Sequence, residues 1–263
     1  MGLVGEFQRE VLAFEAAVRV GARAETAPVV PSCPQWTLTD LVLHLGFVHR
    51  LVSWIFEEGL QQAPDLSDIR FLRRHEGSWE GWPRLENAPN HGPVPDGLAD
   101  WFGEGATALL HAFEECEQDS PVWTWTADRT TGFWLRMQVT EAAVHRWDAE
   151  NAVGTARPMA PELAARAIVH HFEVLAPAWR AQFPSVAGGG ERFRFRPTDH
   201  DTGWTVEFDG DEIRLTEGPG DIELGGSLSE LMLFLWGRVP ADRLDVRGDR
   251  DVLDRYGSFV PEV

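Results

Sequence analysis

The sequence predicts an α+β protein with two parts, an up-and-down four-helix bundle followed by a smaller α/β domain. Two observations lead to this prediction. The first 156 residues hold four long segments with apolar residues at helical spacing, separated by proline-rich connections. Short β-like runs between Gly, Asp and Pro turns follow. Because 263 residues suffice for two ordinary domains, we expect them at 1–156 and 157–263.

The first two helices are predicted by periodicity and by a capping signal. Residues 3–24 repeat apolar side chains at helical spacing. After a proline-rich break, Thr37 with Asp40 three residues later is typical of an N-cap with an acidic first turn. The helix that follows is expected to end at Glu58, just before a glycine. Its otherwise apolar stripe contains His44.

Two further helices complete the predicted bundle. After a loop-like stretch rich in proline, a third helix is expected from about Asp96 to Cys116. The fourth is expected from about Thr130 to Val153, where Gly154 ends it.

The second domain is expected to mix helices with short strands. A helix over residues 160–183 precedes three consecutive glycines, 188–190, which we interpret as a flexible joint. The remaining elements are strands at 192–195, 204–208, 213–215, 222–224 and 244–246, with helices at 228–236 and 251–256.

Composition excludes some partners. The net charge is -19, from 42 acidic and 23 basic residues, so nucleic acid and anionic membranes are not expected to bind. Two cysteines, Cys33 and Cys116, fit a reducing compartment. No uninterrupted apolar run reaches membrane-span length, and the first residues lack the pattern of a signal peptide. We therefore expect a cytoplasmic protein.

The predicted fourth helix carries two metal-ligand residue types on one face. Glu141 and His145 are four residues apart, and Asp148 continues the same face one turn later. Polar groups on a core-facing stripe are costly unless they are paired, hydrogen-bonded or bound to a cation. A carboxylate and an imidazole both bind divalent metals, so a metal site is the first hypothesis.

A catalytic site of this type needs a third protein ligand, which must come from another helix. His44 is the candidate, with a hydrogen-bonded core histidine as the alternative. His49 is turned about 140° from His44 at about 100° per residue, so it is expected on a solvated flank. Asp148 would either orient a ligand or form a salt bridge with an arginine.

Several segments resemble the mycothiol-dependent maleylpyruvate isomerase family, which is related to the DinB-like bundles. The first is residues 31–37 (PSCPQWT), continued by residues 40–46 (DLVLHLG). The second is residues 134–150, which end in EAAVHRWDAE. A looser match joins residues 233–238 (LFLWGR) to residues 246–250 (VRGDR). The resemblance covers nearly the whole chain.

This resemblance implies a fold, a metal and a co-substrate. The N-terminal half would be a DinB-like metal-binding bundle, and the C-terminal half would resemble a sterol-carrier-like domain. The metal ligands would be His44, Glu141 and His145, usually with Zn²⁺. The low-molecular-weight thiol mycothiol would be the co-substrate, and a small electrophile would be the substrate.

The resemblance also implies that an arginine of the C-terminal domain assists catalysis. Arg238 is the candidate because it lies in the matching segment, although Arg243 or Arg247 would serve as well. An arginine suits an acidic substrate because its guanidinium binds carboxylates through two hydrogen bonds.

We therefore expect a metal- and thiol-dependent enzyme, either an isomerase or an S-transferase. A divalent ion stabilises the thiolate at neutral pH, and a thiolate adds to conjugated double bonds. The single bond so formed rotates, and elimination returns the thiol. Two alternatives stay open: a non-catalytic metal- or ligand-binding protein of the DinB-like class, and a metal-dependent hydrolase. A metal with an open coordination position would favour an enzyme.

Overall fold

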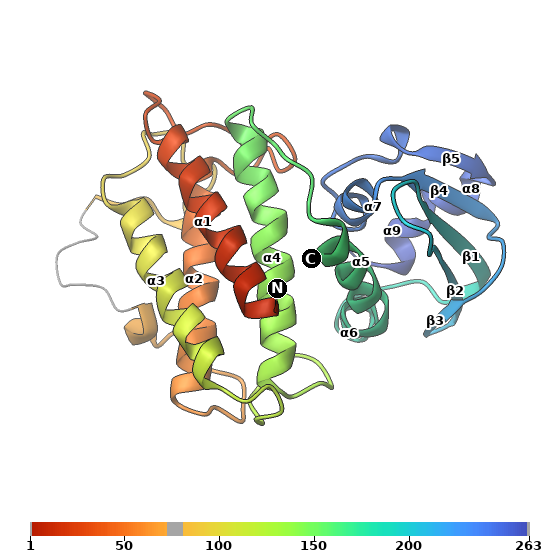
Figure 1. Cartoon of the computed structure of the whole chain (residues 1–263), viewed down its shortest axis with the longest axis horizontal. Helices are drawn as coiled ribbons and strands as arrows, with labels where there is room; N and C mark the ends of the chain where they lie inside the picture. Colours follow the sequence, from red (N-terminus) through yellow and green to blue (C-terminus); the bar gives the residue numbers. More distant parts are fainter. Residues whose placement is uncertain (1, 73–80, 262–263) are drawn as a thin grey trace. The chain divides into compact units, whose positions relative to one another are not determined.

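The structure, a computed structural model, describes residues 2–72 and 81–261 and divides into two compact units. The first unit is Met1–Arg157, and the second is Pro158–Val263. The described part of the first unit is helical, whereas the second combines helices with a five-stranded sheet (Figure 1). The predicted fold class, a helical bundle followed by a smaller α/β domain, is confirmed.

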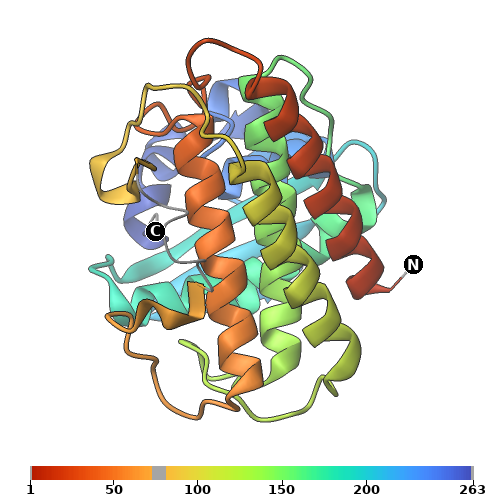
Figure 2. The same ribbon diagram turned by 90° about the vertical axis from the view of Figure 1, so that its left-hand side faces the viewer.

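Four long helices build the first unit: α1 (Leu3–Gly21), α2 (Leu38–Glu57), α3 (Leu98–Glu115) and α4 (Thr131–Ala152). They lie side by side in both Figure 1 and Figure 2. α1 packs mainly against α4 and α3, and α2 packs mainly against α3 and α4. In its described residues, the connection from α2 to α3 contains the short 3-10 turns η1 (Ile69–Leu72) and η2 (Leu85–Asn87).

The helices of the bundle run up, down, down and up, rather than in the alternating up-and-down order that the sequence predicted. The end of α1 meets the start of α2 and the end of α4, because a Cβ atom on Gly21 would lie 2.3 Å from Leu38 and 3.2 Å from Val153. Near the same end, Arg19 of α1 forms an ion pair of 2.6 Å with Asp100 in the first turn of α3. α1 and α4 are therefore parallel, and the long α2–α3 connection returns the chain to the end where α2 began.

The predicted N-cap at Thr37 is confirmed, and Thr37 and Asp40 form a capping box at the start of α2. One carboxylate oxygen of Asp40 accepts hydrogen bonds of 2.8 Å from both the backbone N–H and the hydroxyl of Thr37. The same oxygen accepts a 3.0 Å hydrogen bond from the backbone of Asn90, in the long connection. At α4, the hydroxyl of Thr130 accepts from the backbone of Phe133 at 3.2 Å. Asp40 thus both caps α2 and fastens the connection to it.

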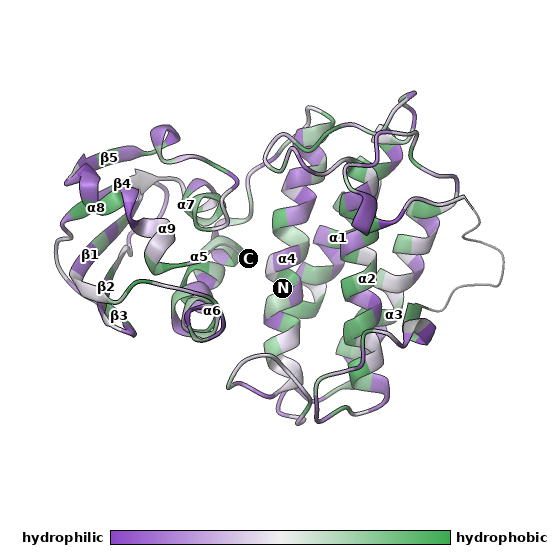
Figure 3. Cartoon of the chain, turned by 180° about the vertical axis from the view of Figure 1, so that it is seen from behind, coloured by the Kyte–Doolittle hydropathy of each residue, from purple (hydrophilic) through white to green (hydrophobic). Residues whose placement is uncertain are grey.

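α2 is long and apolar enough to cross a membrane by length and composition, but 72% of that segment is buried inside the structure. Figure 3 colours it mainly as hydrophobic. Close packing with α3 needs two glycines. A Cβ atom on Gly46 would lie 2.3 Å from the ring of Trp101, and one on Gly105 would lie 2.0 Å from the guanidinium of Arg50. α2 is therefore a core helix of the bundle.

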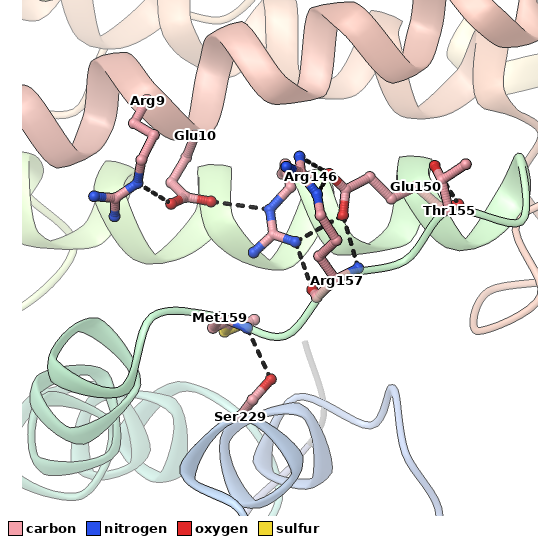
Figure 4. A network of polar contacts seen from close by, with 8 residues as sticks. All are labelled: Arg9, Glu10, Arg146, Glu150, Thr155, Arg157, Met159 and Ser229. Atoms are coloured by element: carbon pink, nitrogen blue, oxygen red, sulfur yellow. Dashed lines mark hydrogen bonds and ion pairs between the residues drawn. The ribbon is translucent and has the colours of Figure 1, made fainter.

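A buried network of charges joins the parallel helices α1 and α4 (Figure 4). Arg146 donates from Nε to Glu10 at 2.9 Å and from Nη1 to Glu150 at 2.8 Å. The exposed fractions of these three side chains are 4%, 5% and 3%, so each charge needs a partner. Arg157, after the end of α4, completes the network through two 2.9 Å hydrogen bonds to Glu150.

The second unit begins with one helical run over the predicted range 160–183. It consists of α5 (Pro161–His170), a π-helical turn (His171–Leu175) and α6 (Ala176–Gln182). The later helical elements are α7 (Leu228–Leu235), η4 (Ala241–Arg243), α8 (Arg250–Asp254) and α9 (Tyr256–Phe259).

The sheet of the second unit has the strand order β3-β2-β1-β4-β5, with β1 and β4 parallel and the other pairs antiparallel. One face is apolar and buried, with Phe193, Phe195 and Phe208 fully inaccessible. The intervening residues of β1 are arginines, two of which pair with carboxylates on the open face. The strands are β1 (Gly188–Pro197), β2 (Trp204–Gly210), β3 (Glu212–Thr216), β4 (Ile222–Gly226) and β5 (Asp245–Gly248).

The prediction of a flexible joint at residues 188–190 is wrong, because these glycines begin β1. A Cβ atom on Gly188 would lie 2.2 Å from the carbonyl oxygen of Phe208, so the close approach of β2 requires glycine there. The pairing register shifts between Gly189 and Glu191, and Gly190 has φ +94°, which favours glycine. The glycines therefore serve strand pairing.

We expect Arg146→Ala to destabilise the protein by about 2–3 kcal/mol, because Glu10 and Glu150 lose the buried cation that they share and are left with the more exposed Arg9 and Arg157 as partners. Urea unfolding would measure the loss. The control is Arg19→Ala, which removes ion pairs to Glu15 and Asp100 from an arginine side chain that is 49% exposed and should cost about 1 kcal/mol or less. Similar losses for both variants would contradict this account of the network.

Candidate metal centre

Three side chains from two helices converge in the first unit. α4 places Glu141 and His145 one turn apart on the side that faces α2, and α2 contributes His44. Each offers one ligand atom, and these atoms all lie within 4.8 Å of one another. Among the residues that the structure describes, these three form the His, Cys, Asp and Glu cluster suited to a metal ion. The structure thus brings together the three residues that the sequence singled out.

The donor set fits a divalent ion. His44 Nε2 and Glu141 Oε1 lie 3.3 Å apart, close to the separation of about 3.4 Å expected for ligands about 2.1 Å from a tetrahedral Zn²⁺. Since a carboxylate only accepts, His44 donates the proton between these two atoms. A metal ion would replace that proton and keep both groups as ligands.

Asp148 holds His145 in a defined orientation. Nδ1 of His145 donates a 3.1 Å hydrogen bond to one oxygen of Asp148, which leaves Nε2 as the nitrogen available to a metal. The hydroxyl of Ser32, in the connection before α2, donates to the other oxygen at 2.6 Å. An imidazole that donates its second N–H to a carboxylate is the usual arrangement of a metal-binding histidine.

Glu141 is anchored in a similar way. Nε2 of Gln138, one turn earlier on α4, donates a 2.7 Å hydrogen bond to Glu141 Oε2. Burial alone would raise the pKa of Glu141. The hydrogen bond from His44 and the charges of the nearby histidines outweigh burial and hold this pKa below its ordinary value. Glu141 is therefore ionised at neutral pH, as a metal ligand must be.

Access to the cluster lies on the side of His44, whose side chain is 27% exposed, compared with 10% for Glu141. The ring of Trp36 packs against His44 with a centroid separation of 4.9 Å. Trp36 and Ser32 belong to the same tight loop, closed by a 2.9 Å hydrogen bond from the backbone of Val30 to the carbonyl of Trp36. This loop therefore supports both histidines. Trp36 packs directly against His44, and Ser32 acts on His145 through Asp148.

The expectation that His49 lies on a solvated flank is wrong. His49 is fully buried, with its ring 5.3 Å from Phe7 of α1 and 5.3 Å from Phe102 of α3. Neither ring nitrogen has a hydrogen-bond partner within the described ranges. Burial lowers the pKa of His49 to about 3, so the ring is neutral at physiological pH. His49 does point away from His44 along α2, but that side of α2 is also buried, because it packs against α1 and α3.

The remaining residues considered from sequence lie elsewhere. Arg238 follows α7 in the second unit and donates from Nη1 to the backbone of Trp236 at 2.7 Å. Cys116 lies at the end of α3, where burial and then the charge of Glu115 raise the pKa of its thiol. Cys33 lies half-buried in the loop before α2.

Sequence reasoning missed two residues of the centre, Gln138 and Ser32. Gln138 could have been found, because it lies three residues before Glu141 on the same helical stripe. Ser32 could not, since its contact with Asp148 spans 116 residues and depends on how the connection folds back.

Comparison with known proteins supports one family throughout the chain. The family model described as "Mycothiol maleylpyruvate isomerase N-terminal domain" matches residues 7–150, and "MDMPI C-terminal domain" matches residues 162–255. No curated protein matches the sequence.

Two solved structures share the fold. A crystal structure of a mycothiol-dependent maleylpyruvate isomerase with one histidine replaced by alanine has a TM-score of 0.61 and 14% identity. A second structure of the mycothiol-dependent maleylpyruvate isomerase has a TM-score of 0.58 and 13% identity. Each match covers 94% of this chain and 93% of the other.

We expect His44→Ala to remove most of the bound divalent metal, because it deletes one of three ligands, whereas His49→Phe should retain it. The His49 variant keeps an aromatic ring between Phe7 and Phe102 but has no nitrogen to bind a metal. Elemental analysis of both purified variants beside the wild type measures this directly. Metal loss in His49→Phe, or full retention in His44→Ala, would show that the ligand set is wrong.

Proposed function

Because the chain belongs to the mycothiol maleylpyruvate isomerase family, we propose that it is a metal-dependent enzyme that uses mycothiol as co-substrate. Its substrate would be a small electrophile with a conjugated double bond, and its reaction would be isomerisation or thiol transfer. The proposed domains are 1–156, which binds the metal, and 157–263. The proposed metal is Zn²⁺, and the proposed setting is the cytoplasm.

The observation that carries this proposal is the convergence of His44, Glu141 and His145. Three protein ligands leave one position of a tetrahedral ion free, which is typical of catalytic rather than structural zinc. The partial exposure of His44 supports access from solvent to that position. A non-catalytic role would be better served by a fourth protein ligand, and the described residues add none to this cluster.

The residues of the centre would have separate roles. His44, Glu141 and His145 would hold the ion, which when bound favours the thiolate form of a thiol that reaches it. Asp148 keeps the proton of His145 on Nδ1 and so keeps Nε2 free. Ser32 fixes Asp148 in turn. Trp36 supports the more exposed ligand, His44, from one side.

The chemistry of the thiol then follows from its nucleophilicity. A thiolate that adds to one carbon of a conjugated cis double bond converts it to a single bond, about which the product can rotate. Elimination breaks the new C–S bond and returns the thiol with a trans double bond. Addition followed by protonation of the neighbouring carbon, with a proton from solvent, gives a stable adduct instead, which is thiol transfer. The strongly acidic chain, with net charge -19, fits small-molecule substrates better than nucleic acid.

We expect conversion of maleylpyruvate, the substrate in the family's name, to require both mycothiol and the metal. The reaction can be followed by absorbance with mycothiol present, with mycothiol omitted, and after removal of the metal by a chelator. Restoring the divalent ion should restore the rate.

Each outcome separates the alternatives. A stable thiol adduct, detected by mass spectrometry, would support an S-transferase. Hydrolysis that needs the metal but no thiol would overturn the thiol-dependent proposal in favour of a hydrolase. Metal binding without turnover of any tested electrophile would favour a ligand-binding protein.

We also propose that Arg238 binds a carboxylate of the substrate. Arg238→Ala should leave the metal content unchanged and lower kcat/KM for an anionic substrate roughly 10- to 100-fold, the effect of one lost charge-assisted hydrogen bond. Arg247→Ala is the comparison variant, because Arg247 is an alternative candidate for the same role and pairs with Asp245 at 2.6 Å. An unchanged kcat/KM in Arg238→Ala would remove Arg238 from the reaction, and a loss in Arg247→Ala instead would give the role to Arg247.

A further inference from the structure

Gln138 is completely buried on α4, one turn before Glu141. Its Nε2 donates to Glu141 Oε2 at 2.7 Å. The orientation of the amide follows from its chemistry, because a carboxylate accepts hydrogen bonds and only the NH₂ end of an amide can donate them. The amide oxygen of Gln138 then has no hydrogen-bond partner in the described part of the chain.

Packing alone does not explain a glutamine at position 138. A buried carbonyl oxygen without a partner makes the folded state less stable than an apolar side chain of similar size would. Gln138 therefore contributes something that an apolar residue could not, and among the described residues its amide hydrogen-bonds to Glu141 alone.

The two oxygens of Glu141 have different surroundings. Oε1 lies 3.3 Å from His44, inside the ligand cluster, whereas Oε2 is held by Gln138. A carboxylate whose second oxygen accepts such a hydrogen bond favours binding a metal through the first oxygen only. An unanchored carboxylate can bind through both oxygens and occupy an additional coordination position.

We propose that Gln138 is a positioning residue that makes Glu141 a one-oxygen ligand and so keeps a coordination position free for the thiol. The inference rests on the proposed function, because it assumes a metal ion at this centre. It also gives each ligand on α4 its own anchor one turn away, Gln138 for Glu141 and Asp148 for His145.

The test uses Co²⁺ in place of the native ion, because its visible absorption is strong when it is four-coordinate and weakens as the coordination number rises. Gln138→Met should still bind one Co²⁺ per chain but absorb more weakly than the wild type. Titration with 2-mercaptoethanol, followed by the sulfur-to-cobalt charge-transfer band, should give a dissociation constant raised roughly 10- to 100-fold.

Two further variants separate positioning from packing. Gln138→Asn keeps an amide but is too short to reach Glu141, so it should repeat the change seen in Gln138→Met. Thr140→Val is the control, because Thr140 is also buried on α4 but its hydroxyl donates to the backbone carbonyl of Arg136, at 3.0 Å, rather than to a ligand. Its spectrum and thiol affinity should equal those of the wild type.

The outcomes are distinct for the two proposals. Wild-type absorption and thiol affinity in both Gln138 variants would overturn the positioning role while leaving the metal centre intact. The same change in Thr140→Val would assign the effect to general disturbance of α4 and overturn it too. A wild-type chain that binds no Co²⁺ would overturn the proposed function together with this inference.

Discussion

Helix α4 is buried along almost its whole length and carries charged side chains on two of its sides. Each buried charge must find a partner, because an isolated one would cost more than the packing around it contributes. On the side of α1 the partners are arginines, which neutralise Glu10 and Glu150. On the side of α2 the donors are an amide, a hydroxyl and imidazoles, which orient Glu141 and Asp148 without a fixed opposite charge in those contacts.

The rest of the bundle supplies the partners for the side of α4 that faces α2. Because α1 and α4 are parallel, the loop after α1 lies at the end of α4 where Ser32 can reach Asp148. The same loop leads into α2 through the capping box of Asp40, which sets where α2 begins and hence the level of His44. The long connection to α3 is fastened to Asp40 through Asn90. The buried carboxylate of Asp40 thus holds both connections at the start of α2 and, by fixing where α2 begins, sets the position of His44 along the bundle.

The sequence predicted what local periodicity determines and missed what depends on tertiary contacts. The helical spacing of Glu141 and His145 and the capping box of α2 follow from local geometry, so both were predictable. The burial of His49 was not, because a helix with one apolar stripe is expected to face the core on one side, whereas α2 contacts α3 and α4 and has Phe7 of α1 against it. The prediction for the glycines at 188–190 was wrong for a similar reason. Their role is determined by pairing with β2, which lies about twenty residues later in the chain and cannot be read from the local sequence.

The contrast between the two sides of α4 also explains why Gln138 is not an arginine. An arginine beside Glu141 would neutralise the buried carboxylate, as Arg146 and Arg157 do for Glu150, and would leave no net negative charge to attract a cation. A neutral amide fixes one oxygen but keeps the charge of the carboxylate, and the neutral ring of His49 adds no positive charge to oppose a metal ion. The same helix can therefore use arginine where a carboxylate is structural and neutral donors where a carboxylate must remain available to bind.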